Sequence, residues 1–270
     1  MKIDSHVHIG GEYLGFHMNE EMVLEMMKKY QIDYAIVSNV DAGELDHSQK
    51  LIPKEHQICQ EDAVRRTIDF ARKNPGKIGG AVWAKPILQG VTEELEEIIR
   101  ENRDVIQAIK LHPYHMNLSP TDEKVLPYIR LAEKYQLPVV SHTGGCEAAN
   151  PVHLYEAAQM FPTIPFIMVH MGLGTDNKEA LDLLGKQENL YGDTTWVPIS
   201  TTIEAIRRYG SKKMLFGSDA PIDGVDTYLC NPKGERSVYQ DYFQVLPEKI
   251  RKEEFEDLMF RNAMRIFDLK

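Results

Sequence analysis

Residues 165–172 read Pro165-Phe-Ile-Met-Val-His170-Met-Gly172, a nearly continuous apolar run that ends in a histidine and a glycine. Such a run is typical of a parallel strand that is buried on both faces, because it leaves no face for water. A second run of the same kind occurs at Tyr34-Ala-Ile-Val37. We therefore expect a parallel β-sheet that is covered by helices on its faces.

Apolar runs alternate with amphipathic segments along the whole chain. The 270 residues match the size of one (β/α)8 barrel, and no glycine-rich dinucleotide motif follows the first strand to favour an open sheet. The sequence thus predicts an α/β fold, a single-domain TIM barrel over residues 1–270. We expect strands near 2–9, 33–40, 78–86, 105–113, 138–143, 165–171, 190–195 and 214–220, and helices near 19–30, 60–74, 92–103, 121–136, 149–161, 176–186, 200–210 and 251–268.

Two connections are longer than the usual strand-to-helix loop of about 2–6 residues. One spans residues 41–59 after the second strand, and the other spans residues 221–236 after the eighth. Both follow the carboxyl end of a strand, where barrel enzymes place their active sites. We expect both loops to overhang the pocket and shape specificity, although a long loop can equally make an oligomer contact.

Composition restricts the partners of the chain. Acidic residues outnumber basic ones by 41 to 31, a net charge of −10, which argues against nucleic acid. There is no apolar span of about 20 residues for a membrane helix, and because a strand is predicted from residue 2 we expect no signal peptide. Three widely spaced cysteines, Cys59, Cys146 and Cys230, fit reduced thiols. We expect a cytoplasmic protein that binds a small molecule, and a homodimer is left open.

The first strand carries the pattern Asp4-Ser-His6-Val-His8. Side chains two apart on a strand point to the same face, so His6 and His8 converge. Two imidazoles at a strand end form half of a coordination shell for a metal such as zinc. The pattern by itself also fits a polar strand end, and further candidate ligands elsewhere in the chain favour the metal. Asp4 shares the parity of the two histidines but lies lower, which favours a supporting role.

The fourth strand places a lysine inside the predicted barrel. In Ala108-Ile-Lys110-Leu-His112, the apolar Ile109 and Leu111 share one face and should meet the helices. Lys110 and His112 then point into the barrel lumen. A buried ammonium is costly without a partner, so Lys110 is expected to have a specific role or an ion pair.

Three more titratable residues follow other strands: His142 after the fifth strand, His170 after the sixth and Asp219 after the eighth. Carboxyl ends of barrel strands meet at one face, so these residues are expected near His6 and His8. The remaining histidines fall in loops or helix starts, where exposure to solvent is expected. They are His17, His47, His56, His115 and His153.

Taken in order, these motifs resemble the amidohydrolase superfamily. More narrowly, the chain is similar to the amidohydrolase-related family that includes aminocarboxymuconate-semialdehyde decarboxylase and related decarboxylases and hydrolases. Phe216-Gly-Ser-Asp219-Ala-Pro221 resembles its strand 8 signature, and Arg261-Asn-Ala-Met-Arg-Ile-Phe267 its closing helix. The likeness spans residues 3–267.

The resemblance implies that His6, His8, His142 and Asp219 bind a metal. His170 would be a further ligand, or would orient and deprotonate the bound water, and Asp219 could accept the same proton. The segment around Lys110 also resembles dihydroorotase-type enzymes, where this lysine is carboxylated and bridges two metals; the alternative is an ion-paired ammonium. We expect zinc, with manganese as the alternative, as one ion or as two if Lys110 is carboxylated.

The implied chemistry is hydrolysis of an amide, lactone or ester in a small, carboxylated substrate by a metal-activated water. The nearest alternative is a metal-dependent, non-oxidative decarboxylase on the same scaffold. A phosphoesterase would need more acidic ligands and a basic substrate channel, which the sequence does not offer. A catalytically inert barrel that only binds metal would not need the full ligand set. We expect substrate contacts from His112, Tyr114 and Trp196.

Overall fold

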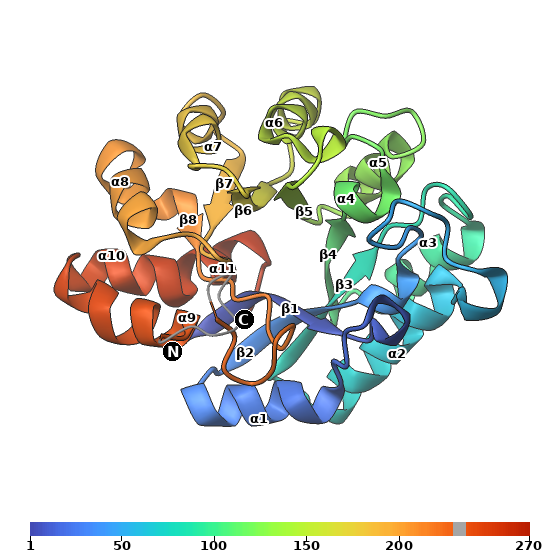
Figure 1. The fold of residues 1–270 in the computed structure, drawn as a ribbon, viewed down its shortest axis with the longest axis horizontal. Helices are drawn as coiled ribbons and strands as arrows, with labels where there is room; N and C mark the ends of the chain where they lie inside the picture. The colour runs from blue at the N-terminus through green and yellow to red at the C-terminus, as the bar shows by residue number, and fades with distance from the viewer. Residues whose placement is uncertain (229–235) are drawn as a thin grey trace.

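The computed structural model describes residues 1–228 and 236–270. Eight parallel strands form one sheet whose spatial order is the order of the chain, and the helices lie outside it (Figure 1). This arrangement is the predicted TIM barrel. The strands are β1 (Ile3–Ile9), β2 (Tyr34–Asn39), β3 (Ile78–Trp83), β4 (Ile106–Leu111), β5 (Val139–Gly144), β6 (Phe166–Leu173), β7 (Leu190–Asp193) and β8 (Met214–Leu215).

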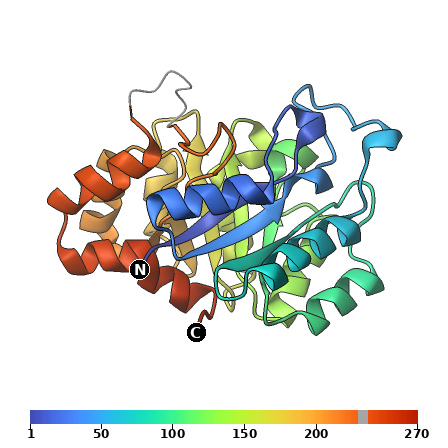
Figure 2. The same cartoon turned by 90° about the horizontal axis from the view of Figure 1, so that it is seen from below.

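Helices connect the strands and cover the outer face of the barrel (Figure 2). Side-chain caps define where two of them begin: Asn19 accepts a hydrogen bond from the backbone of Met22, and Thr92 accepts one from Leu95, both at 3.0 Å. The α-helices are α1 (Glu20–Tyr30), α2 (Gln60–Lys73), α3 (Glu93–Glu101), α4 (Pro113–Met116), α5 (Leu126–Lys134), α6 (Pro151–Met160), α7 (Lys178–Leu184), α8 (Ile199–Tyr209), α9 (Val238–Gln240), α10 (Lys252–Glu256) and α11 (Asn262–Ile266).

The ring of strands closes between β1 and the segment that follows β8. The backbone N–H of His8 donates to the carbonyl of Ala220 at 2.8 Å, and that of Asp219 donates to the carbonyl of His6 at 2.9 Å. These bonds complete the barrel. They also place the carboxylate of Asp219 beside the two histidines of the first strand, although the three residues are far apart in the chain.

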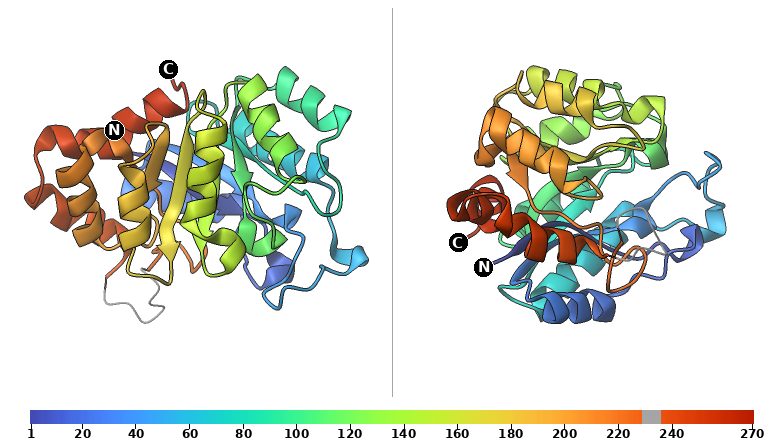
Figure 3. Two further views of the ribbon diagram at one scale, coloured as in Figure 1. Left: turned by 90° about the horizontal axis from the view of Figure 1, so that it is seen from above. Right: turned by 60° about the vertical axis from the view of Figure 1, so that its left-hand side comes forward.

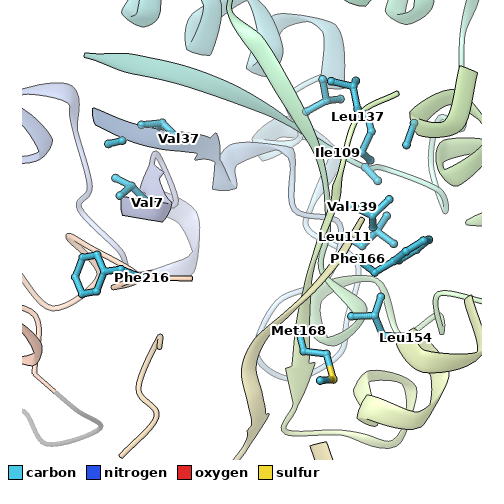
Figure 4. Packing of buried hydrophobic residues seen from close by; sticks show 14 of the residues in the cluster. Val7, Val37, Ile109, Leu111, Leu137, Val139, Leu154, Phe166, Met168 and Phe216 are labelled. Carbon is cyan, nitrogen blue, oxygen red and sulfur yellow. The ribbon is translucent and has the colours of Figure 1, made fainter. Parts of the chain in front are cut away.

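Alternation along β4 is as predicted. Ile109 and Leu111 are buried in the large cluster between strands and helices, which Figure 4 shows together with Leu154 of α6. Ala108 belongs to a second cluster inside the barrel, so Lys110 shares the inward face. The second cluster forms the barrel floor, and α11 closes it. Its buried members are Ile3, Ile36, Ala81, Ala108, Val140, Ile167, Val169, Leu215, Ala263, Ile266 and Phe267.

Several element bounds differ from the prediction. β8 is only two residues long, and the segment after it continues beside β1 and has a positive φ of 68° at Asp219. β4 ends earlier because Pro113 begins the short helix α4. α5 begins at residue 126, not 121, and the last predicted helix is divided by a π-helical turn at Asp257–Arg261. The helical segment that starts at Val238 was not predicted.

Both long loops lie at the end of the barrel away from the chain termini, and the 41–59 loop projects from it (Figure 3). The second loop, residues 221–236, is described only in part, since residues 229–235 fall outside the description. Cys230 is among these residues; Cys59 and Cys146 are free thiols. In the described chain, every helix is too short or too polar to traverse a bilayer.

Candidate active site

A cavity of about 560 Å³ lies at the carboxyl ends of the strands. The predicted site residues on its wall are His8, His112, Tyr114, His142, His170, Trp196 and Asp219. His6 and Lys110 are buried, 3% and 1% exposed, in contact with this group. A second cavity of about 710 Å³ lies at the other end of the barrel and holds none of the predicted residues. The predicted site residues therefore lie together at the end of the barrel where the parallel strands have their carboxyl ends.

Three predicted ligands form a compact group at this cavity. The ligand atoms of His6, His170 and Asp219 all lie within 4.8 Å of one another, and all three side chains are buried. Nε2 of His6 is 3.6 Å from Oδ1 of Asp219. Zinc bonds of about 2.0–2.2 Å place two ligand atoms at most about 4.4 Å apart. The group is therefore at or close to the size that one divalent ion requires, and its two nitrogens and carboxylate suit such an ion.

His8 and His142 reach the cavity but stand outside this compact group. Nε2 of His8 is 2.9 Å from Oδ1 of Asp219, and its Nδ1 is 2.9 Å from the hydroxyl of Ser38. Nε2 of His142 donates instead to the backbone carbonyl of Gly144 at 3.1 Å. Ligation by His8 and His142 therefore stays a prediction, and His142 would have to give up this hydrogen bond to bind through Nε2.

The imidazoles of the site are neutral at neutral pH. Burial, and then Lys110, lowers the pKa of His6 well below its usual value. Burial also lowers the pKa of His170 to about 4, and that of His142 well below the usual range. A metal binds only the neutral imidazole, so these side chains can bind one without first losing a proton.

The side chain of Lys110 extends from β4 to His6 of the first strand. Its Nζ is 2.7 Å from Nε2 of His6, and burial lowers the pKa of the ammonium to about 8. Asp219 and Asp193 favour the charged form. Within the described residues no carboxylate oxygen comes within 4.0 Å of Nζ, so the alternative of an ammonium in a direct ion pair is not formed there.

Sequence reasoning missed Asp193, which ends β7 and is fully buried. Its Oδ1 accepts hydrogen bonds from the backbones of His170 and Thr195 at 3.0 and 3.1 Å, and its Oδ2 accepts the Thr195 hydroxyl at 2.5 Å. Burial raises the pKa of Asp193 to about 7, and a cation bound nearby would favour its carboxylate form. The position of Asp193 at a strand end, like that of Asp219, was the available signal.

Asp4 has the supporting role that the sequence predicts. Its Oδ1 accepts the backbone N–H groups of His6 and Ser218 at 3.2 and 3.1 Å, and its Oδ2 accepts the Ser218 hydroxyl at 2.5 Å. It therefore joins β1 to the segment after β8, directly below the compact group. Burial raises the pKa of Asp4 to about 7.

His112 is held in one orientation at the cavity wall. Its ring is stacked between Trp83 and His142, with centroids 4.9 and 4.3 Å away. Nδ1 of His112 accepts the backbone N–H of His115 at 3.3 Å, so the neutral ring carries its proton on Nε2. Burial lowers the pKa of His112 well below its usual value. The ring thus offers one N–H donor from the wall.

Tyr114 and Trp196 also line the cavity, as predicted. The Tyr114 hydroxyl reaches the backbone carbonyl of His47 at 3.5 Å. Trp196 lies over His170 with a centroid distance of 5.3 Å, and its backbone has a positive φ of 56°. Its indole Nε1 is buried and has no hydrogen-bond partner among residues 1–228 and 236–270. Such a donor is costly to leave unpaired, so Trp196 is a second candidate to bind a substrate oxygen.

The prediction that His115 is exposed is wrong. The side chain is 5% exposed, and its Nδ1 donates to the carbonyl of Leu45 at 2.7 Å. The backbone of Leu45 in turn donates to the carbonyl of His115 at 2.9 Å. The 41–59 loop folds over the end of β4 and covers the ring. His47 of this loop is exposed but stands on the cavity wall.

His115→Asn is expected to make the fold less sensitive to acid. Burial lowers the pKa of His115 from 6.5 to about 4. Between these values the unfolded chain binds a proton that the folded chain does not, so stability falls as the pH falls from 6.5 to 4, by at most about 3 kcal/mol. Asparagine does not titrate and can still donate to Leu45. Urea unfolding at about pH 7 and about pH 4.5 measures the difference.

His153→Asn is the matched control. His153 lies on α6, with its Nδ1 3.4 Å from Oε2 of Glu156, away from the cavity. This variant should lose as much stability on acidification as the unchanged protein. An equal loss in the His115 and His153 variants would show that His115 does not contribute to the acid sensitivity.

Comparison with known proteins gives the family. Residues 3–269 match the sequence model of a family described as amidohydrolase. Among curated protein sequences, none matches the chain. The fold is similar to 2,6-dihydroxybenzoate decarboxylase from Rhizobium, with a TM-score of 0.68 and 16% identity over 99% of this chain and 98% of that chain.

Two other solved structures show the same fold. One is a 5-carboxyvanillate decarboxylase from Novosphingobium aromaticivorans complexed with manganese, with a TM-score of 0.70 and 12% identity over 100% of this chain and 96% of that chain. The other is a probable 2-pyrone-4,6-dicarboxylic acid hydrolase from Acinetobacter baumannii, with a TM-score of 0.66 and 13% identity over 99% of each chain. With the family model matching nearly its whole length, the chain belongs to the amidohydrolase family and is an enzyme of that family.

Proposed function

We propose that the protein is a metal-dependent hydrolase that cleaves an amide, lactone or ester bond of a small, carboxylated substrate. The observation that supports this most strongly is the compact group of His6, His170 and Asp219 beside the 560 Å³ cavity. A cluster of neutral imidazoles and a carboxylate at the carboxyl end of a barrel is suited to metal-assisted hydrolysis.

His6, His170 and Asp219 would hold the ion, with His8 and His142 as the additional predicted ligands. When bound, a divalent ion lowers the pKa of a water ligand and polarises a carbonyl group. Zinc is our first expectation and manganese the alternative. One ion suffices for this chemistry. A second ion would require that Lys110 is carboxylated, which would replace a buried ammonium by an anionic ligand.

Asp219 is the base in this proposal. Burial by itself raises the pKa of its carboxyl group, but the hydrogen bond from His8 and the nearby His170 and Lys110 bring the pKa below its usual value. The group is therefore ionised at neutral pH and can accept the proton of the attacking water. His170 is the alternative base, as the sequence suggests, in the arrangement in which it does not itself bind the ion. Either residue would then return a proton to the leaving group.

The cavity wall supplies the groups that would orient a substrate. His112 presents an N–H from Nε2, and Trp196 carries an indole N–H that has no partner among residues 1–228 and 236–270. Both are neutral donors suited to carbonyl or carboxylate oxygens. Lys110 can balance negative charge that develops during the reaction. Tyr114 adds a hydroxyl group at the rim.

The second candidate is a non-oxidative decarboxylase that uses the same residues. The observation that favours it is the aromatic wall, where Trp83 lies stacked on His112 and Trp196 lies over His170, a surface that fits a flat aromatic acid. Two of the similar structures carry the names of decarboxylases. For either activity we propose a cytoplasmic location and a small-molecule substrate, with a homodimer as the alternative to a monomer.

Metal depletion and a substrate screen test the proposal together. The protein is treated with a chelator, and zinc or manganese is then added back before assays with lactones, amides, esters and aromatic acids. The proposal expects turnover that disappears with the metal and returns with it, without release of carbon dioxide. Metal-dependent carbon dioxide release would favour the decarboxylase. Equal turnover by the metal-free protein would contradict both.

A further inference from the structure

The segment after β7 contacts both imidazoles of the compact group without being part of it. The side chain of Thr195 lies 3.2 Å from Nδ1 of His6, and its backbone carbonyl lies 3.3 Å from Nδ1 of His170. We infer that Asp193 and Thr195 position the metal centre by holding the ring proton of His6 and of His170 on Nδ1, at His6 together with Lys110. The inference rests on one part of the proposed function, namely that a metal binds to these two imidazoles.

His170 has one possible arrangement in this contact. A backbone carbonyl can only accept a hydrogen bond, so Nδ1 of His170 must be the donor to Thr195. The neutral ring then carries its proton on Nδ1, and Nε2 keeps its lone pair. The backbone N–H of His170 donates to the carboxylate of Asp193 at 3.0 Å. Both the backbone and the ring of His170 are therefore fixed.

The proton of His6 follows from its contact with Lys110. An ammonium group has only donors, so at 2.7 Å its partner Nε2 of His6 must be the acceptor. The proton of the neutral ring therefore lies on Nδ1 and is donated to the hydroxyl oxygen of Thr195. His6 and His170 thus have the same tautomer, with the proton on Nδ1 and the lone pair on Nε2. In His6 this lone pair accepts from Lys110, so a bound metal would have to take the place of that hydrogen bond.

Asp193 determines the direction of the Thr195 hydroxyl. The hydroxyl can accept from His6 only if its own hydrogen points elsewhere, and Oδ2 of Asp193 takes that hydrogen at 2.5 Å. Oδ1 accepts the backbone N–H of Thr195 at 3.1 Å, so the turn cannot rotate away. Oδ2 of Asp193 is 3.7 Å from Nδ1 of His6, too far for a direct hydrogen bond. Asp193 therefore acts on His6 through Thr195.

Such contacts to the far nitrogen of a metal-binding histidine set the orientation and basicity of the ring, and their loss weakens metal affinity by about 10–100-fold. Asp193 and Thr195 are positioning residues in this sense. Thr195→Val keeps the size and the backbone carbonyl, so it removes the partner of His6 and leaves that of His170. Thr195→Ser keeps the hydroxyl and should behave like the unchanged protein.

Thr194→Val is the matched control. Thr194 is also fully buried, but its hydroxyl donates to the carbonyl of Gly217 at 2.9 Å and does not touch an imidazole. Asp193→Asn provides a second perturbation, because an amide cannot accept on both of its side-chain atoms. All four variants are first compared by thermal unfolding, so that only folded proteins are carried forward.

Two measurements test the inference. Nitrogen-15 NMR of the imidazoles in the metal-free protein should show His6 and His170 protonated on Nδ1. Thr195→Val removes the acceptor of the Nδ1 proton while Lys110 stays, so it should lower the share of Nδ1-protonated His6 without changing His170, and Asp193→Asn should lower it too. Calorimetric titration with zinc should show an affinity about 10–100-fold lower in Thr195→Val and close to unchanged in Thr195→Ser and Thr194→Val.

The inference is overturned if Thr195→Val leaves the His6 tautomer and the zinc affinity unchanged, or if Thr194→Val shifts them equally. Its failure is distinct from a failure of the proposed function. Should the unchanged protein bind no zinc, the proposed function fails, while the NMR measurement still decides whether Asp193 and Thr195 fix the tautomers. A normal zinc affinity with an Nε2-protonated His6 would contradict the inference alone.

Discussion

Asp219→Asn is expected to reduce kcat by about 10²–10⁴-fold, because the amide has nearly the same size but can neither carry the charge nor accept a proton. Asp219 is central to the site: its Oδ1 lies 2.9 Å from Nε2 of His8 and 3.6 Å from Nε2 of His6. The same substitution should also weaken zinc binding, since the compact group loses its single carboxylate. Steady-state kinetics and zinc titration measure the two effects.

Asp223→Asn is the control for this substitution. Asp223 stands on the same cavity wall four residues further along, and its Oδ2 accepts the backbone N–H of Tyr228 at 3.0 Å, which asparagine can still do. We expect kcat to change by no more than about threefold. Equal losses in the two variants would mean that the cavity needs acidic charge in general and that Asp219 is not its base.

Lys110→Met is expected to raise the stability of the protein and to lower its activity. Lys110 is 1% exposed and its hydrogen-bond partner is a neutral imidazole, so replacing the ammonium by an apolar side chain of similar length removes a desolvation cost. We expect the unfolding free energy of the metal-free protein to rise by about 1 kcal/mol or more. Activity should fall by about 10²–10³-fold, since the charge or ligand that Lys110 supplies is lost.

Lys85→Met controls for burial of a lysine as such. Lys85 is 2% exposed, and its Nζ donates to the carbonyl of Ile58 at 2.6 Å, outside the cavity. This variant should retain activity within a few-fold, whatever happens to its stability. Urea unfolding and kinetics on both variants give the comparison. A Lys110→Met protein that is less stable yet fully active would assign Lys110 to the structure instead of the chemistry.

The barrel and most of its site were predictable because they depend on periodicity. The alternation in β1 and β4 places His6, His8 and Lys110 on inward faces regardless of loop structure. Closed parallel barrels bring all carboxyl strand ends to one face, so His170 and Asp219 had to lie near them. These inferences needed only which face a residue occupies and at which end of its strand.

Contacts made by irregular segments were not predictable in this way. The burial of His115 depends on the course of the 41–59 loop, and the hydrogen bond from His142 to Gly144 depends on a single side-chain rotation. Asp193 ends β7, so its position was a usable signal, but its role could not be read from that position. Its role becomes visible only when the partners His170 and Thr195 are placed in space.

The most direct test is a crystal structure of the zinc- or manganese-loaded protein with anomalous data at the absorption edge of that metal. We expect an anomalous peak bonded to His6, His170 and Asp219 at about 2.0–2.2 Å for zinc. Density for a carboxylated or an unmodified Lys110 would be read from the same map. A loaded protein whose metal lies away from these three side chains would contradict the proposed metal centre.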